Sequence, residues 1–346
     1  MLPPPEHMKL TPSEVFTSAQ EQHASDVHVA AGYPVLLRID GALSPLSAEK
    51  MTAEAAEEFV RAVLGKAQWE RLIQDREIDV SFVSESGVRL RVNCHFERGR
   101  PGLVARLIPV AIPSLAEVGL QGMIEPFCEL QNGLILLTGP TGSGKSTSLA
   151  AMLQHINQTR AASVVTLEDP IEFVFPQGKC VIRQRELHSD FTSFPEALRH
   201  VLRQDPNVVM VGEMRDLETI AAALTLAETG HLILATLHTP NAVQTIDRII
   251  DVFPPHQQSQ IQSQLSLSLK AVIAQRLVPS AKGGRTAVRE ILMNTPAVAN
   301  IIRDHRLQEL PSVLQTGGEA GMRTFQKDAE RLVKEGMITK EVAKGV

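Results

Sequence analysis

The chain has 346 residues, 43% of them hydrophobic and 21% charged, a globular composition with enough length for two or three folded units. A formal net charge of −5 and an aromatic content of 4% argue against a nucleic-acid-binding protein, which usually has a basic surface and stacking aromatic rings. The three cysteines, Cys94, Cys128 and Cys180, are far apart, which argues against a disulfide framework or a zinc site and favours a reducing compartment.

The sequence contains no candidate for a membrane-spanning helix. No apolar run reaches the roughly 20 residues needed to cross a bilayer, and residues 1–5 (MLPPP) do not begin a secretory signal. We therefore expect a cytoplasmic protein, at a membrane face only through partners.

Residues 1–108 are expected to form a small α+β domain. Thr11, Pro12 and Glu14 have the spacing of a helix start with a capping box. Alternating or apolar runs bounded by turn residues predict strands at residues 35–39, 88–92 and 103–108.

The pattern changes after a proline-containing hinge at residues 109–113. From residue 114 to residue 279, short apolar runs alternate with helical periodicity, which is typical of a parallel sheet flanked by helices. Residues 280–346 are expected to be helical. The predicted fold class is therefore α/β, with a P-loop core, a smaller N-terminal domain and a helical C-terminal region. The apolar runs expected as core strands are residues 134–137, 164–167, 208–211 and 232–235.

Residues 139–146 (GPTGSGKS) fit the phosphate-loop pattern G-x-x-x-x-G-K-[ST] at every position. Glycines let consecutive backbone N–H groups point at phosphate oxygens, and the N-terminus of the following helix adds a positive dipole. Lys145 is expected to reach the β- and γ-phosphates of ATP, and Ser146 to bind Mg²⁺. The expected nucleotide-binding residues are Gly139, Pro140, Thr141, Gly142, Ser143, Gly144, Lys145, Ser146 and Thr147.

Two acidic residues follow expected core strands. Glu213 comes after residues 208–211, so its carboxylate is expected at the carboxyl edge of the sheet, beside the phosphate loop if the strands are neighbours. We predict that Glu213 is the catalytic base. Glu168 ends another strand and is expected to organise Mg²⁺ or its waters. Helix capping or loop hydrogen bonding is the alternative, above all for Asp169 and Glu172.

Two histidines bracket the apolar run at residues 232–235. We expect His231 and His238 at the same edge of the sheet, where a histidine can hydrogen-bond the γ-phosphate or Glu213 and report the nucleotide state. A purely structural role is the alternative, and the spacing of the two does not fit a zinc pair.

These segments together resemble the motor ATPases of secretion and pilus systems, and most closely the PilT-type retraction ATPases of type IV pili. The resemblance covers nearly the whole chain, and its most specific part is the Walker B signature with the His box. The matching segments are residues 25–28 (SDVH) and 38–41 (RIDG) of the N-terminal signature, 139–146 of Walker A, 166–173 (TLEDPIEF) of the Asp box, 202–216 (LRQDPNVVMVGEMRD) of Walker B and 229–239 (TGHLILATLHT) of the His box.

The resemblance implies a homohexameric ring whose subunits have a PAS-like N-terminal domain and a RecA-like C-terminal domain. It implies ATP at the junction between domains and subunits, with Glu213 as the Walker B glutamate and Glu168 as the Asp-box acid beside Mg²⁺. N-terminal arginines serve in these motors as charge clamps on the γ-phosphate, and Arg91 and Arg106 best fit that role. Arg91 also lies on the polar face of its expected strand, although a solvated face remains the alternative. The implied partners are the inner-membrane platform protein of the pilus and a paralogous pilus motor.

The expected function is ATP hydrolysis that powers pilus retraction and twitching motility. Two residues depart from the family pattern: Asn207 stands where Walker B usually has Asp, and Ala299 stands where the retraction motif, close to AIRNLIRE, has its first arginine. An accessory or paralogous pilus or secretion motor therefore stays open, as does a non-hydrolysing ATP-binding regulator.

A RecA-like nucleic-acid motor is a third alternative, against which the acidic charge argues. Assembly and type II secretion motors usually carry a four-cysteine zinc module, which three scattered cysteines do not match.

Overall fold

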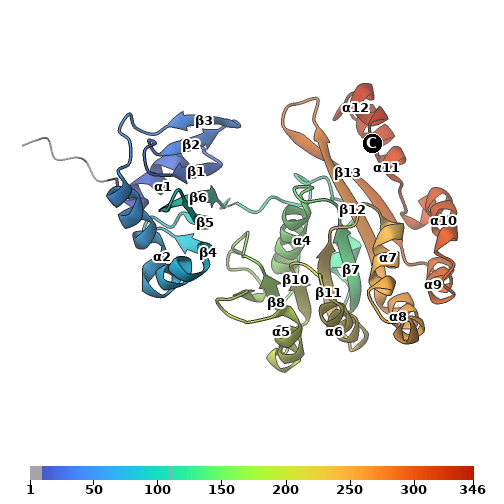
Figure 1. Ribbon diagram of the computed structural model, residues 1–346. Coiled ribbons are helices and arrows are strands. Elements are labelled where there is room, and N and C mark those ends of the chain that lie inside the picture. The colour runs from blue at the N-terminus through green and yellow to red at the C-terminus, as the bar shows by residue number, and fades with distance from the viewer. Residues whose placement is uncertain (1–9, 109–110) are drawn as a thin grey trace, which may run out of the picture. The chain divides into compact units, whose positions relative to one another are not determined.

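A computed structural model describes residues 10–108 and 111–346. The expectations about residues 1–5 and about residues 109–110 of the hinge lie outside the described residues. The chain divides into two compact units, Met1–Ala111 (unit 1) and Ile112–Val346 (unit 2), coloured from blue to green and from green to red in Figure 1. In the described ranges, no helix is both long enough and apolar enough to cross a membrane.

In its described residues, unit 1 is a six-stranded antiparallel sheet with two helices. Helix α1 (Pro12–Glu21) begins with the predicted capping box, in which Thr11 and Glu14 satisfy each other's backbone N–H groups. The strand order is β3-β2-β1-β6-β5-β4. The remaining elements are α2 (Ala53–Asp75), β1 (Asp26–Val29), β2 (Leu36–Ile39), β3 (Ala42–Pro45), β4 (Glu77–Val83), β5 (Arg89–Glu97) and β6 (Arg100–Leu107).

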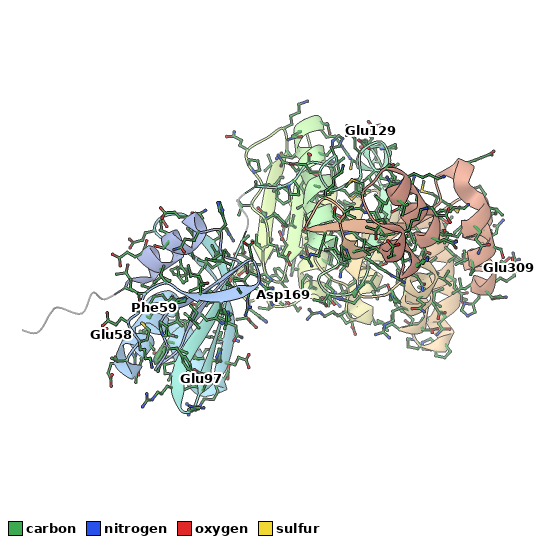
Figure 2. The ribbon with its side chains drawn as sticks, turned by 90° about the horizontal axis from the view of Figure 1, so that it is seen from above. Glu58, Phe59, Glu97, Glu129, Asp169 and Glu309 are labelled. Atoms are coloured by element: carbon green, nitrogen blue, oxygen red, sulfur yellow. The ribbon has the colours of Figure 1, made fainter. Side chains whose placement is uncertain are left out.

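The two faces of the unit 1 sheet differ in character because alternate residues of a strand point to opposite sides. Apolar strand residues such as Leu90 and Ala105 join Phe16 of α1 and Phe59 of α2 in one buried core. Phe59 is labelled among the unit 1 side chains in Figure 2. The other strand positions carry the arginines, as the alternation in residues 88–92 predicted.

Unit 2 is built on a seven-stranded sheet of order β13-β12-β7-β11-β10-β8-β9. All four predicted core strands are confirmed, and every pairing is parallel except that of β12 with β13. The strands are β7 (Gly133–Thr138), β8 (Ser163–Glu168), β9 (Val181–Glu186), β10 (Val208–Val211), β11 (Leu232–Leu237), β12 (Leu269–Pro279) and β13 (Arg285–Met293).

Helices cover both faces of this sheet (Figure 1). In β7, Leu134 and Leu136 belong to the core shared with α5, α6 and α8, whereas Ile135 and Leu137 belong to the core shared with α3 and α4. The helices are α3 (Glu125–Cys128), α4 (Lys145–Thr159), α5 (Phe194–Val201), α6 (Leu217–Glu228), α7 (Ala242–Asp251), α8 (Pro255–Ser268), α9 (Pro296–Arg303), α10 (Leu310–Thr316), α11 (Phe325–Lys334) and α12 (Lys340–Lys344), with short 3₁₀ turns η1 (Leu202–Gln204), η2 (Leu307–Glu309) and η3 (Gly317–Ala320).

The C-terminal region differs from expectation at its start. Residues 285–293, expected within a helical region, form β13, the edge strand of the sheet beside β12. The β-branched and apolar residues of this stretch pack against β12 and α11, and such tertiary contacts override a weak local pattern. Helices begin at residue 296, and α11 has the predicted apolar face that includes Phe325, Ala329 and Leu332.

Candidate functional site

The phosphate loop connects the end of β7 to the start of α4, as the sequence predicts. Gly139, Gly142 and Gly144 all have positive φ angles, of 141°, 77° and 85°. Such angles are open to glycine and strained for other residues, so the loop can curl with its N–H groups turned inward. The hydroxyl groups of Thr138 and Ser143 are buried without a hydrogen-bond partner in the described structure. Unsatisfied donors in a curled loop fit a phosphate group.

Lys145 is the first residue of α4 and is folded back over the loop. Its Nζ donates hydrogen bonds to the carbonyl oxygens of Gly139 at 2.8 Å and Pro140 at 3.1 Å. Burial lowers the pKa of Lys145, although the nearby Glu213 and Glu172 carboxylates act in the opposite direction. The ammonium group is therefore held at the loop by partners that a phosphate can replace.

Glu213 reaches the phosphate loop through a histidine. Strand β10 is not the neighbour of β7, because β11 lies between them. His238, just after β11, fills the gap: its Nδ1 lies 3.3 Å from Thr141 Oγ1 and its Nε2 lies 3.2 Å from Glu213 Oε1. His238 can donate to Glu213 through Nε2–H, while its Nδ1 contacts the hydroxyl of Thr141. The prediction that His238 can contact Glu213 is therefore met by a direct contact.

Arg215 is the second partner of Glu213, and it was not predicted. Its Nη2 lies 2.8 Å from Glu213 Oε2, and its Nη1 lies 4.0 Å from Asp169. Burial alone would raise the pKa of Glu213, but the hydrogen bond from Arg215 and the charges of His238 and Arg215 outweigh burial and lower it. The carboxylate is thus ionised and positioned, as a proton acceptor requires.

Glu168 lies deeper than expected. It is 6% exposed, at the end of β8, and accepts hydrogen bonds from Thr166 Oγ1 at 2.6 Å and Gln184 Nε2 at 3.0 Å. Burial raises its pKa. Glu172, the exposed acid of the same box, for which a capping or loop role was the alternative, acts together with Glu213 to raise the pKa of Lys145 against the effect of burial.

The expectation that both histidines lie at one edge of the sheet is wrong. Residues that bracket a strand lie at its two ends, about 23 Å apart for a seven-residue separation. His231 precedes β11 at the amino edge, where its Nδ1 lies 3.0 Å from the carbonyl oxygen of Leu226 and 3.3 Å from Thr229 Oγ1. It holds the end of α6, and its side chain makes no hydrogen bond to the phosphate loop among the described residues.

Asn207, which stands where the Walker B pattern usually has Asp, also lies at the amino edge of the sheet. Its side-chain Oδ1 accepts a hydrogen bond of 2.8 Å from the backbone N–H of Ser163, and its own N–H donates to the carbonyl of Ser163. Asn207 therefore aligns the starts of β8 and β10, remote from Glu213. Ala299 lies on α9, half-buried, next to the exposed Asn300.

The two candidate clamp arginines are direct neighbours within unit 1. Arg91 of β5 lies opposite Arg106 of β6 in the register of the sheet, and Arg106 lies opposite Asp26 of β1. Both arginines are exposed, and Asp26 is 6% exposed. Arg106 donates to Asp26, whereas the side chain of Arg91 has no ion pair or hydrogen bond to any residue in the described part of the chain.

The residues around the loop fit a magnesium–nucleotide complex better than a bare metal site. Across residues 10–108 and 111–346, no cluster of three His, Cys, Asp or Glu side chains could hold a metal ion. Mg²⁺ in nucleotide sites is usually held by one or two protein oxygens together with phosphates and waters. The hydroxyl of Ser146, half-buried in the first turn of α4, suits that role.

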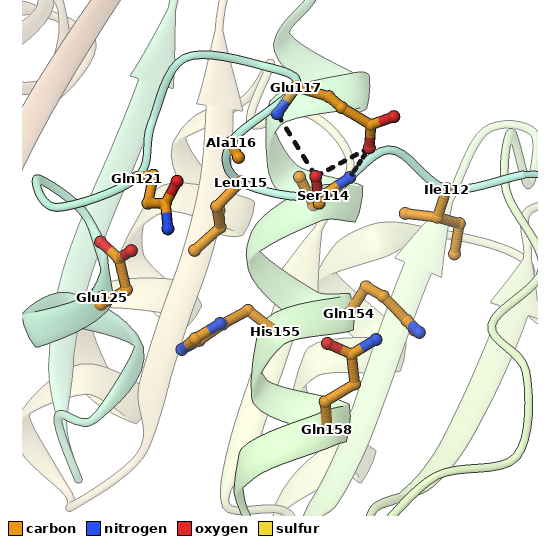
Figure 3. A pocket seen from close by; sticks show the side chains of 11 residues that line it. Ile112, Ser114, Leu115, Ala116, Glu117, Gln121, Glu125, Gln154, His155 and Gln158 are labelled. Atoms are coloured by element: carbon orange, nitrogen blue, oxygen red, sulfur yellow. Dashed lines mark hydrogen bonds between the residues drawn. The ribbon is translucent and has the colours of Figure 1, made fainter.

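A separate pocket of about 300 Å³ lies beside the outer face of α4 (Figure 3). Glu117 at its rim accepts hydrogen bonds of 2.7 Å from the backbone N–H and the hydroxyl of Ser114. The pocket is lined by two glutamates and no lysine or arginine, and it contains no residue of the phosphate loop. It does not suit a triphosphate.

Known proteins match the chain over nearly its whole length. The Type II/IV secretion system protein family matches residues 7–344. A type IV pilus retraction ATPase, PilT, of Pseudomonas aeruginosa is 42% identical over 96% of this chain and 96% of its own length. A twitching motility protein of Neisseria gonorrhoeae is 44% identical over 95% of this chain and 88% of its own.

Among solved structures, the pilus retraction motor PilT with bound ADP is similar with a TM-score of 0.91 and 40% identity, over 97% of this chain and 96% of that one. The predicted α/β fold and the predicted resemblance are both confirmed by these matches.

Proposed function

Since the chain belongs to the Type II/IV secretion system protein family, we propose that it is a hexameric motor that hydrolyses ATP to power retraction of type IV pili. The observation that carries this proposal is the chain of contacts from Thr141 of the phosphate loop through His238 to Glu213. Nucleotide binding needs the loop alone, whereas hydrolysis also needs a carboxylate held beside it. The contacts from Thr141 through His238 hold the carboxylate of Glu213 in that position.

Each residue has a role that follows from its place. The loop N–H groups bind the phosphate oxygens of ATP, and Lys145 leaves the carbonyls of Gly139 and Pro140 for the β- and γ-phosphates. Ser146 would hold Mg²⁺, which would neutralise charge on the phosphates. Glu213 accepts a proton from the attacking water, and His238 holds Glu213 in register with the loop.

Arg91 and Arg106 supply positive charge to the γ-phosphate in this proposal. An arginine in that role contributes roughly 10³–10⁵ to the rate in other phosphoryl-transfer enzymes. The proposal rests on the resemblance and on the exposed, neighbouring positions of the two guanidinium groups in unit 1. Glu168, buried and hydrogen-bonded, is assigned to ordering the Asp box and, through water, the magnesium site.

The test is phosphate release from purified chain with ATP and Mg²⁺. In Glu213→Gln, turnover should fall at least about 100-fold because the proton acceptor is lost, while ADP affinity stays within a few-fold of wild type. Glu218→Gln, an exposed acid in the first turn of α6, is the matched control. Unchanged turnover in Glu213→Gln removes the proposed base, and no turnover by wild type favours a non-hydrolysing regulator.

The biological part of the proposal concerns the pilus. We place the hexamer in the cytoplasm, at the inner membrane through the platform protein of the pilus. Deletion should abolish twitching motility and leave pili that extend but do not retract. Stimulation of turnover by single-stranded DNA would instead support the nucleic-acid motor.

A second candidate, an accessory or paralogous motor, is favoured by one observation. Ala299, half-buried on α9, occupies the place of the first arginine of the retraction motif. Complementation of a strain that lacks all retraction motors separates the two. If the wild-type chain restores retraction when it is expressed alone, it is the main motor. If retraction requires a paralogue as well, or is restored only by the Ala299→Arg variant, the chain is an accessory motor.

A further inference from the structure

The phosphate loop rests on a single buried side chain from a different part of the sequence. Strand β12 runs parallel to β7, with Ala274 beside Thr138, so Gln275 lies alongside Gly139 where the loop begins. A Cβ atom on Gly139 would be 2.2 Å from the Gln275 carbonyl oxygen, and one on Gly144 would be 2.9 Å from Gln275 Nε2. The first and last glycines of the loop therefore both pack against Gln275.

The Gln275 amide makes three hydrogen bonds, and it is 2% exposed. Its Nε2 donates to the carbonyl oxygen of Ser143 at 2.6 Å. Its Oε1 accepts from Ser148 Oγ at 2.9 Å and from Arg289 Nε at 2.8 Å. The amide thus joins the loop to the helix that follows it and to strand β13.

The direction of these bonds matters for phosphate binding. In a trans peptide, the carbonyl oxygen and the next N–H point to opposite sides. Because Gln275 holds the Ser143 carbonyl, the N–H of Gly144 is directed away from the Gln275 amide. That N–H is one of the donors expected to meet a phosphate oxygen.

Arg289 determines which end of the amide faces the loop. A guanidinium group is only a donor, so Oε1 has to face it and Nε2 has to face Ser143. Arg289 is 3% exposed, and its other nitrogens donate to the carbonyls of Val118 at 2.6 Å and Gly119 at 3.2 Å. Burial lowers its pKa to about 10, so the group is still charged at neutral pH.

Helix α11 holds Arg289 in turn. Asp328 Oδ2 accepts the backbone N–H of Arg289 at 2.8 Å, and Oδ1 is paired with Arg323 and Arg331, each at 2.9 Å. Asp328 is 1% exposed. A continuous set of contacts through three buried side chains therefore runs from helix α11 to the phosphate loop.

We propose that Gln275 is a positioning residue for nucleotide binding, which holds the phosphate loop in its binding conformation, and that Arg289 fixes the orientation of its amide. The inference rests on the proposed binding of nucleotide at this loop. It predicts that the Nε2 donor itself, and not only the volume of the side chain, sets the affinity for nucleotide.

The experiment compares variants of the full chain by calorimetric titration with ADP and Mg²⁺, and by thermal melting without nucleotide. Gln275→Glu keeps the volume and the acceptor for Arg289 and Ser148, but places an oxygen against the Ser143 carbonyl. Gln275→Met keeps the approximate volume and removes both polar atoms. Both should bind ADP at least about tenfold more weakly, since each loses the hydrogen bond to the loop.

Gln262→Met is the matched control, because Gln262 is a buried glutamine of α8 whose amide hydrogen-bonds only to His305 among the described residues. It should bind ADP as wild type does, whatever its melting temperature. Arg289→Lys keeps the charge, loses the directed Nε donor, and should weaken ADP binding by about three- to tenfold.

Gln275→Glu with an ADP affinity within twofold of wild type overturns the assignment of Gln275. Arg289→Lys at wild-type affinity overturns that of Arg289. If Gln275→Met does not fold, Gln275→Glu still decides the question, because it retains the contacts to Arg289 and Ser148. A wild-type chain that binds no ADP contradicts the proposed function itself, which is a distinguishable failure.

Discussion

Arg106 Nε donates a hydrogen bond of 2.9 Å to Oδ1 of Asp26, across the neighbouring strands β6 and β1. Asp26 is almost fully buried, and Arg38 of β2 lies 3.7 Å from its second oxygen. Arg91, opposite Arg106 on β5, has no such partner among the described residues. One buried carboxylate therefore orients one of the two candidate clamp arginines and leaves the other free to move.

Replacement of Asp26 by Asn should lower ATP turnover several-fold and destabilise the protein by about 1 kcal/mol at pH 7, because the charged hydrogen bond to Arg106 is lost. Burial would raise the pKa of Asp26, but the hydrogen bonds from Ser25 and Arg106 and the charges of Arg106 and Arg38 lower it. Its stabilising contribution is therefore present above the ordinary pKa of aspartate and disappears as the pH falls through the lowered value.

The measurement is melting temperature against pH for wild type and Asp26→Asn, which should converge in acid. Asp75→Asn is the control, since Asp75 pairs with Arg71 at the exposed surface of α2. Curves that stay separated in acid, or equal losses in the control, would contradict the role of Asp26.

The two histidines that bracket β11 form a matched pair of variants. His238→Gln should reduce turnover about tenfold, since it weakens the link between Thr141 and Glu213, with little change in ADP affinity. His231→Gln, at the opposite end of the strand, should change stability slightly and turnover per folded molecule hardly at all. Equal kinetic effects of the two substitutions would show that His238 has no special part in hydrolysis.

Arg215 should set the acid limb of the pH dependence of turnover. Its hydrogen bond and charge help to lower the pKa of Glu213, and a general base works only when it is ionised. In Arg215→Ala the pKa of Glu213 therefore rises, and the acid limb of kcat moves to higher pH. In Arg215→Lys the acid limb of kcat should move less than in Arg215→Ala, because the positive charge is kept. Arg203→Ala, which removes an exposed arginine of η1, should leave the acid limb at its wild-type position. An acid limb at the wild-type pH in Arg215→Ala would falsify this coupling between Arg215 and the pKa of Glu213.

Glycines of the phosphate loop should differ in their tolerance of alanine. At Gly139 a Cβ would lie 2.2 Å from the backbone oxygen of Gln275, which cannot move without moving β12. Gly139→Ala should therefore weaken ADP binding at least about 100-fold. Gly142 has open space around it, so Gly142→Ala costs only about 1 kcal/mol of backbone strain at φ 77°. Comparable ADP affinities for the two variants would disprove the close packing of the loop on Gln275.

The local motifs of this protein were determined by the sequence alone. The capping box at Thr11, the phosphate loop and the four core strands all formed where residue type and spacing predicted them. Each depends on neighbours within a few residues, through backbone geometry and short-range hydrogen bonds. The family resemblance has the same source, because its motifs are continuous segments.

Only the tertiary structure decided which side chains meet. Strand order placed β11 between β7 and β10, so that His238 became the link to Glu213 and His231 was carried to the far edge. It also brought Gln275 and Arg289, unremarkable in the sequence, beneath the phosphate loop from more than a hundred residues away. Strand order and β-pairing are set by packing of distant segments into shared cores, and no local pattern encodes that choice.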